Sequence, residues 1–404
     1  MTAATFAKTF FRDMALTVPA IRKVYDERNA LMAERHQWAS EISTAHDERD
    51  QAKPAGPISP LPIPHWWERS FWEPTVMLAI RDHCRPGDVV YDVGTNAGAM
   101  AQAMSRLVGP QGHVFAFEAS PRIIGIAQHN LVQHGCANVT LLHRAVWRAS
   151  GETVSLSFGS HLNDRVDVDA EGVSVPTLAL DDLAAATGMR PRFIKMDIEG
   201  AEFDALCGMP RLLDETRPIL VLEQSPDDPR CFELLKSKGY RALDLASYRA
   251  VDSAGDMGPA GVLNMLFAPQ ELKLDGYLPV EPLELIQRLE RDQFAHEPDG
   301  SLTLAQPIQL PKGRYLFRAD FVADGTDNEI FTGVIADGEV IFRYHTFTKF
   351  MADAYRDWVV QLEKSSLVGP YLTFVRGRDP SLDWRGVDIL RVPGFENWQA
   401  PIVE

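Results

Sequence analysis

The stretch Asp88-Val-Val-Tyr-Asp-Val-Gly-Thr-Asn-Ala-Gly98 decides the fold. Its apolar first half is typical of a strand buried on both faces, and Gly94 and Gly98 predict a tight turn before a helix over 97–108. The segment lacks the Gly-x-Gly-x-x-Gly pattern that cradles a diphosphate, and Asp92 at the strand end suits a cationic ligand better. The stretch therefore predicts a loop that binds a nucleotide-like cofactor carrying positive charge.

Strand-like and helix-like segments alternate outward from this stretch, from Asp88 to about Ala268. Seven short apolar runs are predicted as strands, at 89–93, 114–117, 139–142, 193–196, 219–222, 242–245 and 262–267. Helical patterns between them include 97–108, 123–134 and 201–213. The alternation predicts an α/β domain with a seven-stranded, mostly parallel sheet and helices on both faces.

Acidic residues close two further predicted strands. Glu118 follows the run at 114–117, where a carboxylate can accept hydrogen bonds from both ribose hydroxyls of a nucleotide. Asp197 and Glu199 follow the run at 193–196, and ligands bind beyond the carboxyl ends of such strands. S-adenosylmethionine fits, because it joins a ribose to a cationic group without a diphosphate. The alternatives are a solvated charge for Glu118 and helix N-capping for the other two acids.

Five motifs resemble those of the FkbM-type methyltransferases. They are Asp92-Val-Gly-Thr-Asn-Ala-Gly98, Val114-Phe-Ala-Phe-Glu118, Thr177-Leu-Ala-Leu-Asp-Asp182, Ile194-Lys-Met-Asp-Ile-Glu-Gly-Ala-Glu202 and Pro218-Ile-Leu-Val-Leu-Glu223. The resemblance covers roughly residues 88–268, and it implies a Rossmann-like class I fold, S-adenosylmethionine, and usually O-methylation of a sugar or natural-product hydroxyl. Thr95 stands where the family often has alanine. By analogy, Ala145 and Val146 would line the adenine; ordinary strand-end packing is the alternative.

A poorly acidic hydroxyl needs a general base within hydrogen-bond reach before it can accept a methyl group. The candidates are Asp197, Glu199, Glu223 and His161. Our hypothesis is that Asp197 orients or deprotonates the acceptor, while the two glutamates shape the site. His161 lies in a polar segment where an acceptor could dock, although a lone loop histidine is more often structural. No histidine pair has metal-ligand spacing, so the sequence predicts no metal site; a metal held by the acids is the alternative.

The segments outside the α/β region differ in character. Residues 14–50 carry a sevenfold apolar repeat flanked by glutamates, which predicts a short coiled coil through which the chain would self-associate. The alternative is a helix that packs on its own domain or frays. The proline-rich segment 54–64 predicts a semi-rigid linker, and 282–294 has a helical pattern.

Alternating apolar residues in the last hundred positions predict a separate all-β sandwich. Asp337-Gly338 between two apolar runs is a hairpin signal. Small sandwiches often recognise carbohydrate by aromatic stacking, for which Trp384, Trp398 and Tyr344 are candidates. The alternative places these side chains in the core.

Composition limits the function classes. The net charge of −16 disfavours binding to nucleic acid or an anionic membrane, and a hydrophobic fraction of 45% allows a sizeable core. The four cysteines lack Cys-x-x-Cys spacing, which predicts reduced, partly buried thiols and a cytoplasmic protein. No apolar run reaches the roughly 18 residues of a membrane span.

The sequence therefore predicts a methyltransferase that modifies a sugar hydroxyl on a glycan or glycolipid, or, alternatively, a secondary-metabolite hydroxyl. A non-catalytic scaffold or carbohydrate-binding protein with this fold is the alternative from another class. The expected units are a helical segment over 1–53, the linker over 54–64, the methyltransferase domain over 65–275, a connecting helix over 276–296 and the β-sandwich over 297–404. The expected cofactor residues are Asp92, Gly94, Thr95, Asn96, Gly98, Glu118, Ala119, Ala145 and Asp197.

Overall fold

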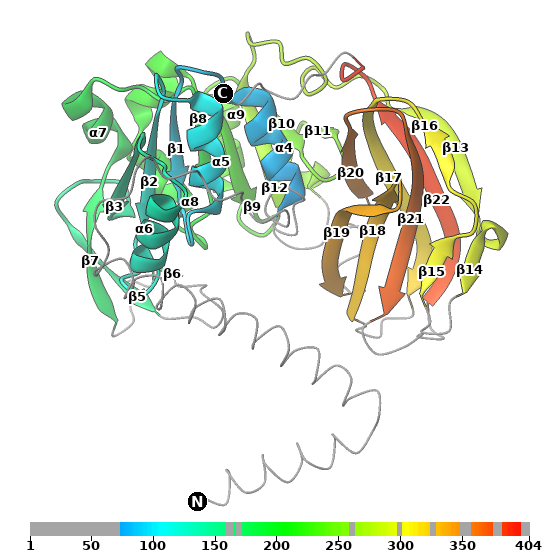
Figure 1. The fold of residues 1–404 in the computed structure, drawn as a ribbon. Coiled ribbons are helices and arrows are strands. Elements are labelled where there is room, and N and C mark those ends of the chain that lie inside the picture. The colour runs from blue at the N-terminus through cyan, green and yellow to red at the C-terminus, as the bar shows by residue number, and fades with distance from the viewer. Residues whose placement is uncertain are drawn as a thin grey trace, which may run out of the picture.

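The computed structural model describes residues 73–157, 165–166, 172–257, 263–296, 301–323, 329–347, 357–374 and 382–396. In this part the chain forms an α/β domain and a β-sandwich that lie side by side (Figure 1). The predicted coiled coil, the proline-rich linker, His161 and Trp398 lie outside the described residues.

The α/β domain is built on an eight-stranded sheet with the order β11-β10-β12-β9-β8-β1-β2-β3. The strands are β1 (Val89–Val93), β2 (His113–Glu118), β3 (Val139–His143), β8 (Phe193–Met196), β9 (Ile219–Gln224), β10 (Tyr240–Asp244), β11 (Arg249–Val251) and β12 (Leu263–Pro269). Within this sheet the neighbouring strands β9, β8, β1, β2 and β3 pair in parallel. Strand β12 is antiparallel to both of its neighbours, β9 and β10. All seven predicted strands are present. The predicted count of seven is wrong, because β11 has three residues, two of them exposed, and shows no apolar run.

Two hydrophobic clusters pack against this sheet, and side chains of β1 divide between them. Val90 belongs to one cluster, whereas Tyr91 and Val93 belong to the other, as expected when successive strand residues point to opposite faces. The described helices are α4 (Pro74–His83), α5 (Ala99–Val108), α6 (Ile124–Gln133), α7 (Leu180–Thr187), α8 (Glu202–Cys207) and α9 (Arg230–Ser237). Helix α5 buries Met100, Ala101, Met104, Leu107 and Val108, whose spacing forms a single apolar stripe.

The helix predicted over 201–213 is interrupted. Helix α8 ends at Cys207, and a short π-helical turn, Leu212–Thr216, follows. Gly208 lies between them, and a Cβ atom there would come within 2.1 Å of the Trp147 carbonyl oxygen. The chain therefore approaches a neighbouring segment too closely for an ordinary helix to continue with a side chain at this position.

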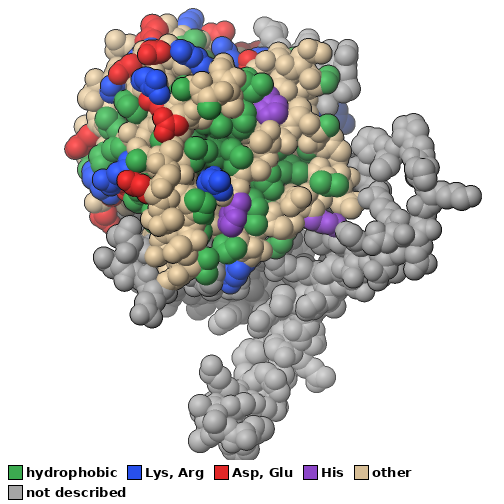
Figure 2. All heavy atoms as spheres, turned by 90° about the vertical axis from the view of Figure 1, so that its left-hand side faces the viewer, with side chains coloured by type: hydrophobic (Ala, Val, Ile, Leu, Met, Phe, Trp, Pro, Cys, Tyr) green, Lys and Arg blue, Asp and Glu red, His purple; other side chains and the backbone are tan. Residues whose placement is uncertain are grey.

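A small sheet with the order β4-β7-β5-β6 extends the α/β domain beyond β3. Its strands are β4 (Ala145–Val146), β5 (Thr153–Ser157), β6 (Arg165–Val166) and β7 (Val173–Leu178). Figure 2 shows hydrophobic side chains and histidines gathered on the outer side of the α/β domain, where β3 forms the sheet edge. All five residues of β3 are half-buried, as an edge strand predicts.

Two further sheets share one hydrophobic core and form the predicted sandwich. The first contains β13 (Glu284–Glu290), β17 (Gly313–Ala323), β20 (Asp357–Leu362) and β22 (Leu382–Val392). The second contains β14 (Phe294–His296), β15 (Leu302–Leu304), β16 (Ile308–Leu310), β18 (Glu329–Ala336), β19 (Glu339–Phe347) and β21 (Ser366–Phe374). The hairpin prediction is confirmed: Asp337 and Gly338 join β18 to β19, and both have positive φ.

Two predictions for this region are wrong. Residues 282–294 contain no helix beyond a single 3₁₀ turn, because β13 pairs with β22 and this tertiary pairing overrides the local helical pattern. Trp384 is not available to stack on a sugar ring, because it is buried among core side chains and its ring stacks on Phe321. Tyr344 lies in β19, and its side chain is outside the described atoms.

Direct contacts join the α/β domain to the sandwich. Arg314 of β17 is completely buried, and its Nη1 donates to Asp82 Oδ2 of α4 at 2.6 Å. The same nitrogen donates to the hydroxyls of Tyr248 (2.8 Å) and Tyr277 (2.9 Å), and the guanidinium lies 3.7 Å from the ring centroid of Phe395. One hydrophobic cluster also contains residues of both units.

The four cysteines are free thiols, as predicted: Cys84 and Cys231 are buried, Cys136 is half-buried and Cys207 is exposed. In the part of the chain that the structure describes, no helix is both long and apolar enough to cross a membrane.

Candidate functional site

The loop between β1 and α5 has the tight turn that its glycines predict. Gly94, Asn96 and Gly98 all have positive φ, and the amides of Gly94 and Thr95 donate to the Phe117 carbonyl at the end of β2. A Cβ atom on Gly94 would lie 1.8 Å from the Asp197 carbonyl oxygen. The loop is therefore pressed against the end of β8, which brings the first and third predicted motifs together.

Glu118 fixes the position of the loop from the neighbouring strand. Its Oε2 accepts the amide of Asn96 at 2.9 Å, and its Oε1 accepts the amide of Ser120 at 2.7 Å. The side chain is mostly buried, so it is no freely solvated charge. A carboxylate oxygen can accept more than one hydrogen bond, which suits a side chain that also has to bind a ligand.

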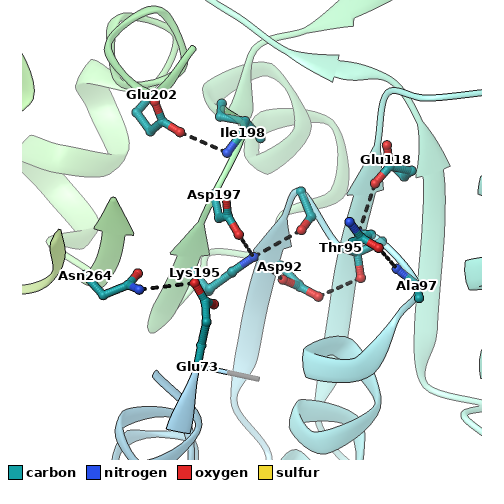
Figure 3. A network of polar contacts seen from close by, with 12 residues as sticks. Glu73, Asp92, Thr95, Ala97, Glu118, Lys195, Asp197, Ile198, Glu202 and Asn264 are labelled. Carbon is teal, nitrogen blue, oxygen red and sulfur yellow. Dashed lines mark hydrogen bonds and ion pairs between the residues drawn. The ribbon is translucent and has the colours of Figure 1, made fainter. Parts of the chain in front are cut away.

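A buried lysine joins the acids of β1 and β8 (Figure 3). Lys195 Nζ donates to the Gly94 carbonyl (3.1 Å) and to Asp197 Oδ2 (3.3 Å), and it lies 4.0 Å from Asp92 Oδ1. Asp92 is fully buried, and its Oδ2 accepts the Thr95 hydroxyl at 2.6 Å. Burial raises the pKa of Asp92, an effect that Lys195 opposes. The lysine thus holds the loop and both acids in one network.

Two residues outside the predicted motifs, Glu73 and Asn264, lie beside these acids. We call Glu73, Asp92, Asp197 and Glu223 the acidic group. Glu73, the residue before α4, extends toward Lys195 (Figure 3), and its Oε1 accepts Asn264 Nδ2 at 3.1 Å. Asn264 of β12 stands opposite Glu223 of β9. One carboxylate oxygen from each of Glu73, Asp197 and Glu223 lies within 4.8 Å of the other two.

Burial dominates the electrostatics of this group. It raises the pKa of Glu223 to about 9, and the carboxylates of Asp197 and Glu73 contribute in the same direction. Burial also raises the pKa of Glu73, although Lys195 opposes the shift. A carboxylic acid with a pKa of about 9, such as Glu223, keeps a proton near neutral pH unless a cation stabilises the charged form.

The remaining predicted residues lie around this centre. Glu199 is exposed and has positive φ, and it does not cap α8, whose N-cap position is Ala201. In the described part of the chain, no side chain forms a capping hydrogen bond at the start of α8, so capping does not explain Asp197, and Glu202 accepts the Ile198 amide at 2.9 Å. Ala119 is half-buried directly after Glu118, and its carbonyl lies 3.0 Å from His143 Nε2.

Ala145 lies in β4 and is buried in a small apolar cluster. Its cluster neighbours are Val154, Leu156 and Val175. This packing corresponds to the alternative that the sequence left open for it, and the adenine contact stays a prediction.

The strand order, with an antiparallel β12 and acids closing β1, β2 and β8, defines a Rossmann-like α/β domain. Residues 92–242 match the family model of the methyltransferase FkbM domain, so the chain contains a domain of this family.

Several known methyltransferases are similar to parts of the chain. The hexuronic acid methyltransferase AglP of Haloferax volcanii is 26% identical over 175 residues, which are 43% of this chain and 71% of that protein. A protein-L-isoaspartate O-methyltransferase of Ignicoccus hospitalis is 45% identical over 14% of this chain and 28% of its own length. The tRNA (adenine(58)-N(1))-methyltransferase catalytic subunit TRM61 of Cryptococcus neoformans is 32% identical over 23% of this chain and 22% of its own.

The chain thus spans about a quarter of the length of the last two relatives. Among solved structures, the methyltransferase FkbM from Methylobacillus flagellatus has 17% identity and a TM-score of 0.32, over 45% of this chain and 43% of that one.

Proposed function

We propose that this chain is an S-adenosylmethionine-dependent methyltransferase whose acceptor is a sugar hydroxyl of a glycan or glycolipid. The observation that carries the proposal is the position of Asp197. Its partly exposed carboxylate follows β8, directly beside the glycine loop, and Lys195 holds it there. A cofactor in that loop and an acceptor at Asp197 would be neighbours, as an in-line transfer requires.

The donor set around the loop suits this cofactor. Asp92, Glu118 and Asp197 favour a cationic, ribose-bearing ligand, whereas a diphosphate would meet three carboxylates. Glu118 would hold the ribose, and the loop residues Gly94 to Gly98 would lie along the cofactor. When bound, S-adenosylmethionine supplies an electrophilic methyl group.

The chain's own contribution is alignment and proton removal. We assign Asp197 as the group that orients or deprotonates the acceptor hydroxyl, with a hydrogen bond to Lys195 fixing its orientation. Glu223, with its pKa of about 9, acts better as a hydrogen-bond donor to the acceptor than as a base near neutral pH. Glu199 and His161 remain secondary candidates at the acceptor side.

A sugar acceptor is supported by the similarity to AglP, which extends over 71% of that protein, a larger share than for the other two relatives described above. A secondary-metabolite hydroxyl is the alternative acceptor. We further propose the methyltransferase domain over 65–275 and self-association through residues 1–53.

The cofactor assignment is tested by calorimetry with S-adenosylhomocysteine on the full chain. Glu118→Ala should weaken binding about tenfold or more, because a charge-assisted contact to the ribose is lost. Glu152→Ala, at an exposed site, is the matched control and should bind like the wild type. Absence of binding to folded wild-type protein would refute the cofactor assignment.

The catalytic assignment needs a transfer assay with radiolabelled S-adenosylmethionine and a panel of hexuronic acids and neutral oligosaccharides. Asp197→Asn should keep S-adenosylhomocysteine binding and lose at least about 100-fold in transfer rate, the usual contribution of a general base. Wild-type transfer rates in this variant would refute the role of Asp197.

A further inference from the structure

One lysine, Lys195, lies among four carboxyl groups, those of Glu73, Asp92, Asp197 and Glu223. Lys195 directs its hydrogen bonds to Gly94 and Asp197 and lies beside Asp92. Among the described residues, neither Glu73 nor Glu223 forms an ion pair with a lysine, arginine or histidine. Glu73 and Glu223 therefore lie within 5 Å of each other and of Asp197, and the charge of Lys195 acts on Glu73 without a hydrogen bond between them.

A second observation concerns the individual oxygens. Glu73 Oε1 accepts Asn264 Nδ2, whereas Glu73 Oε2 is shielded from solvent and has no hydrogen-bond partner among the described residues. Figure 3 shows that the Glu73 side chain points from the start of α4 toward Lys195 and Asp197. A buried carboxylate oxygen without a hydrogen-bond partner is costly, and Lys195 acts on Glu73 through its charge and not through a hydrogen bond, so Glu73 Oε2 has room to accept a positive ligand.

The geometry of the three carboxylates fits a small cation. Oxygens within 4.8 Å of one another need only small side-chain adjustments to lie about 2.0 to 2.4 Å from one central ion. Oxygen-only ligands favour hard divalent cations, and Asn264 offers a further amide oxygen beside Glu73 if its side chain rotates. We propose that Glu73, Asp197 and Glu223 bind one divalent cation of the Mg²⁺ or Mn²⁺ type.

The ligands come from three separate parts of the chain. Asp197 and Glu223 end parallel strands, whereas Glu73 precedes the segment that matches the FkbM domain. A cation here would lie at the acceptor side of the glycine loop, where it would orient an acceptor oxygen and lower its pKa. This role rests on the proposed function; the binding itself does not, because it needs neither cofactor nor acceptor.

The test is a titration of the full chain, stripped with a chelator, with Mn²⁺ followed by electron paramagnetic resonance. We expect one bound Mn²⁺ per chain, displaced by Mg²⁺. Glu73→Gln and Glu223→Gln should each weaken binding about tenfold or more, since each removes a charged ligand. Glu233→Gln, an exposed substitution on α9 with the same change in charge, is the control and should bind like the wild type.

Glutamine preserves the shape of the side chain and removes repulsion, so both variants should fold, which urea unfolding verifies. Failure of the wild-type protein to bind Mn²⁺ at millimolar concentration would overturn the proposal, as would wild-type affinity in both variants. Because S-adenosylhomocysteine binding is measured separately, a missing metal site would leave the methyltransferase proposal standing.

Discussion

Replacing Arg314 with methionine should destabilise the protein strongly, because this arginine compensates a buried charge between the two domains. Arg314 and Asp82 are both buried, and their closest atoms are 2.6 Å apart. Burial alone would raise the pKa of Asp82, but the charge and hydrogen bond of Arg314 lower it below its usual value. Removing one partner of such a pair typically costs about 3–5 kcal/mol, since the other charge stays buried.

The assay is urea unfolding at pH 7, followed by tryptophan fluorescence. Arg314→Met should lower the free energy of unfolding by about 3–5 kcal/mol, whereas Asp82→Asn combined with Arg314→Met should recover much of that loss, because no buried charge remains. Arg190→Met is the control, since Arg190 pairs with Glu215 at the surface, where ion pairs contribute about 0–1 kcal/mol. A loss below about 1 kcal/mol for Arg314→Met, or simple additivity in the double variant, would refute this reasoning.

Three shorter predictions concern the site and the sandwich core. Gly94→Ala should destabilise the protein by about 1–3 kcal/mol and abolish S-adenosylhomocysteine binding, because the new Cβ atom meets the Asp197 carbonyl. Gly87→Ala, also at positive φ but with open space around it, should keep binding. In the presence of a chelator, the free energy of unfolding should fall as pH rises from 4.5 towards 9, by up to about 1.4 kcal/mol per pH unit. The reason is that Glu223 keeps its proton in the folded protein and releases it in the unfolded chain. Glu223→Gln should flatten this pH dependence, as measured by urea unfolding. Trp384→Ala should cost about 3–5 kcal/mol in the same assay, and a smaller loss would contradict its place in the core.

The sequence predicts the α/β domain well because its buried strands leave a strong local signal. Each parallel strand is a short apolar run between turn residues. Such a run is typical of a strand that is buried on both faces of a sheet. The helix prediction for residues 282–294 was wrong for the opposite reason, because the local pattern there does not determine the structure. Of the seven residues in β13 only Leu289 is buried, so its strand pairing depends on β22, almost a hundred positions later, and not on its own pattern.

The site was predicted only in part, and the residues that were missed differ in kind. Lys195 carries a readable signal, because a charged residue inside the run Phe193–Met196 must find partners when the strand is buried. Glu73 carries almost none. A residue before Pro74 suggests a helix start, but its nearness to Asp197 arises only from the packing of α4 beside β9 and β12.

Helix α4 connects the two unusual features of the molecule. Glu73 stands at its N-cap position, in a left-handed backbone conformation, and enters the acidic group. Asp82 lies near the other end, about 14 Å away along a helix that rises 1.5 Å per residue, and pairs with Arg314 of the sandwich. A shift of the sandwich that carried Asp82 along the helix axis would therefore also move Glu73 relative to Asp197 and Glu223. By this geometry the sandwich, through Arg314, holds the helix that carries Glu73, although the sandwich contributes none of the three carboxylates.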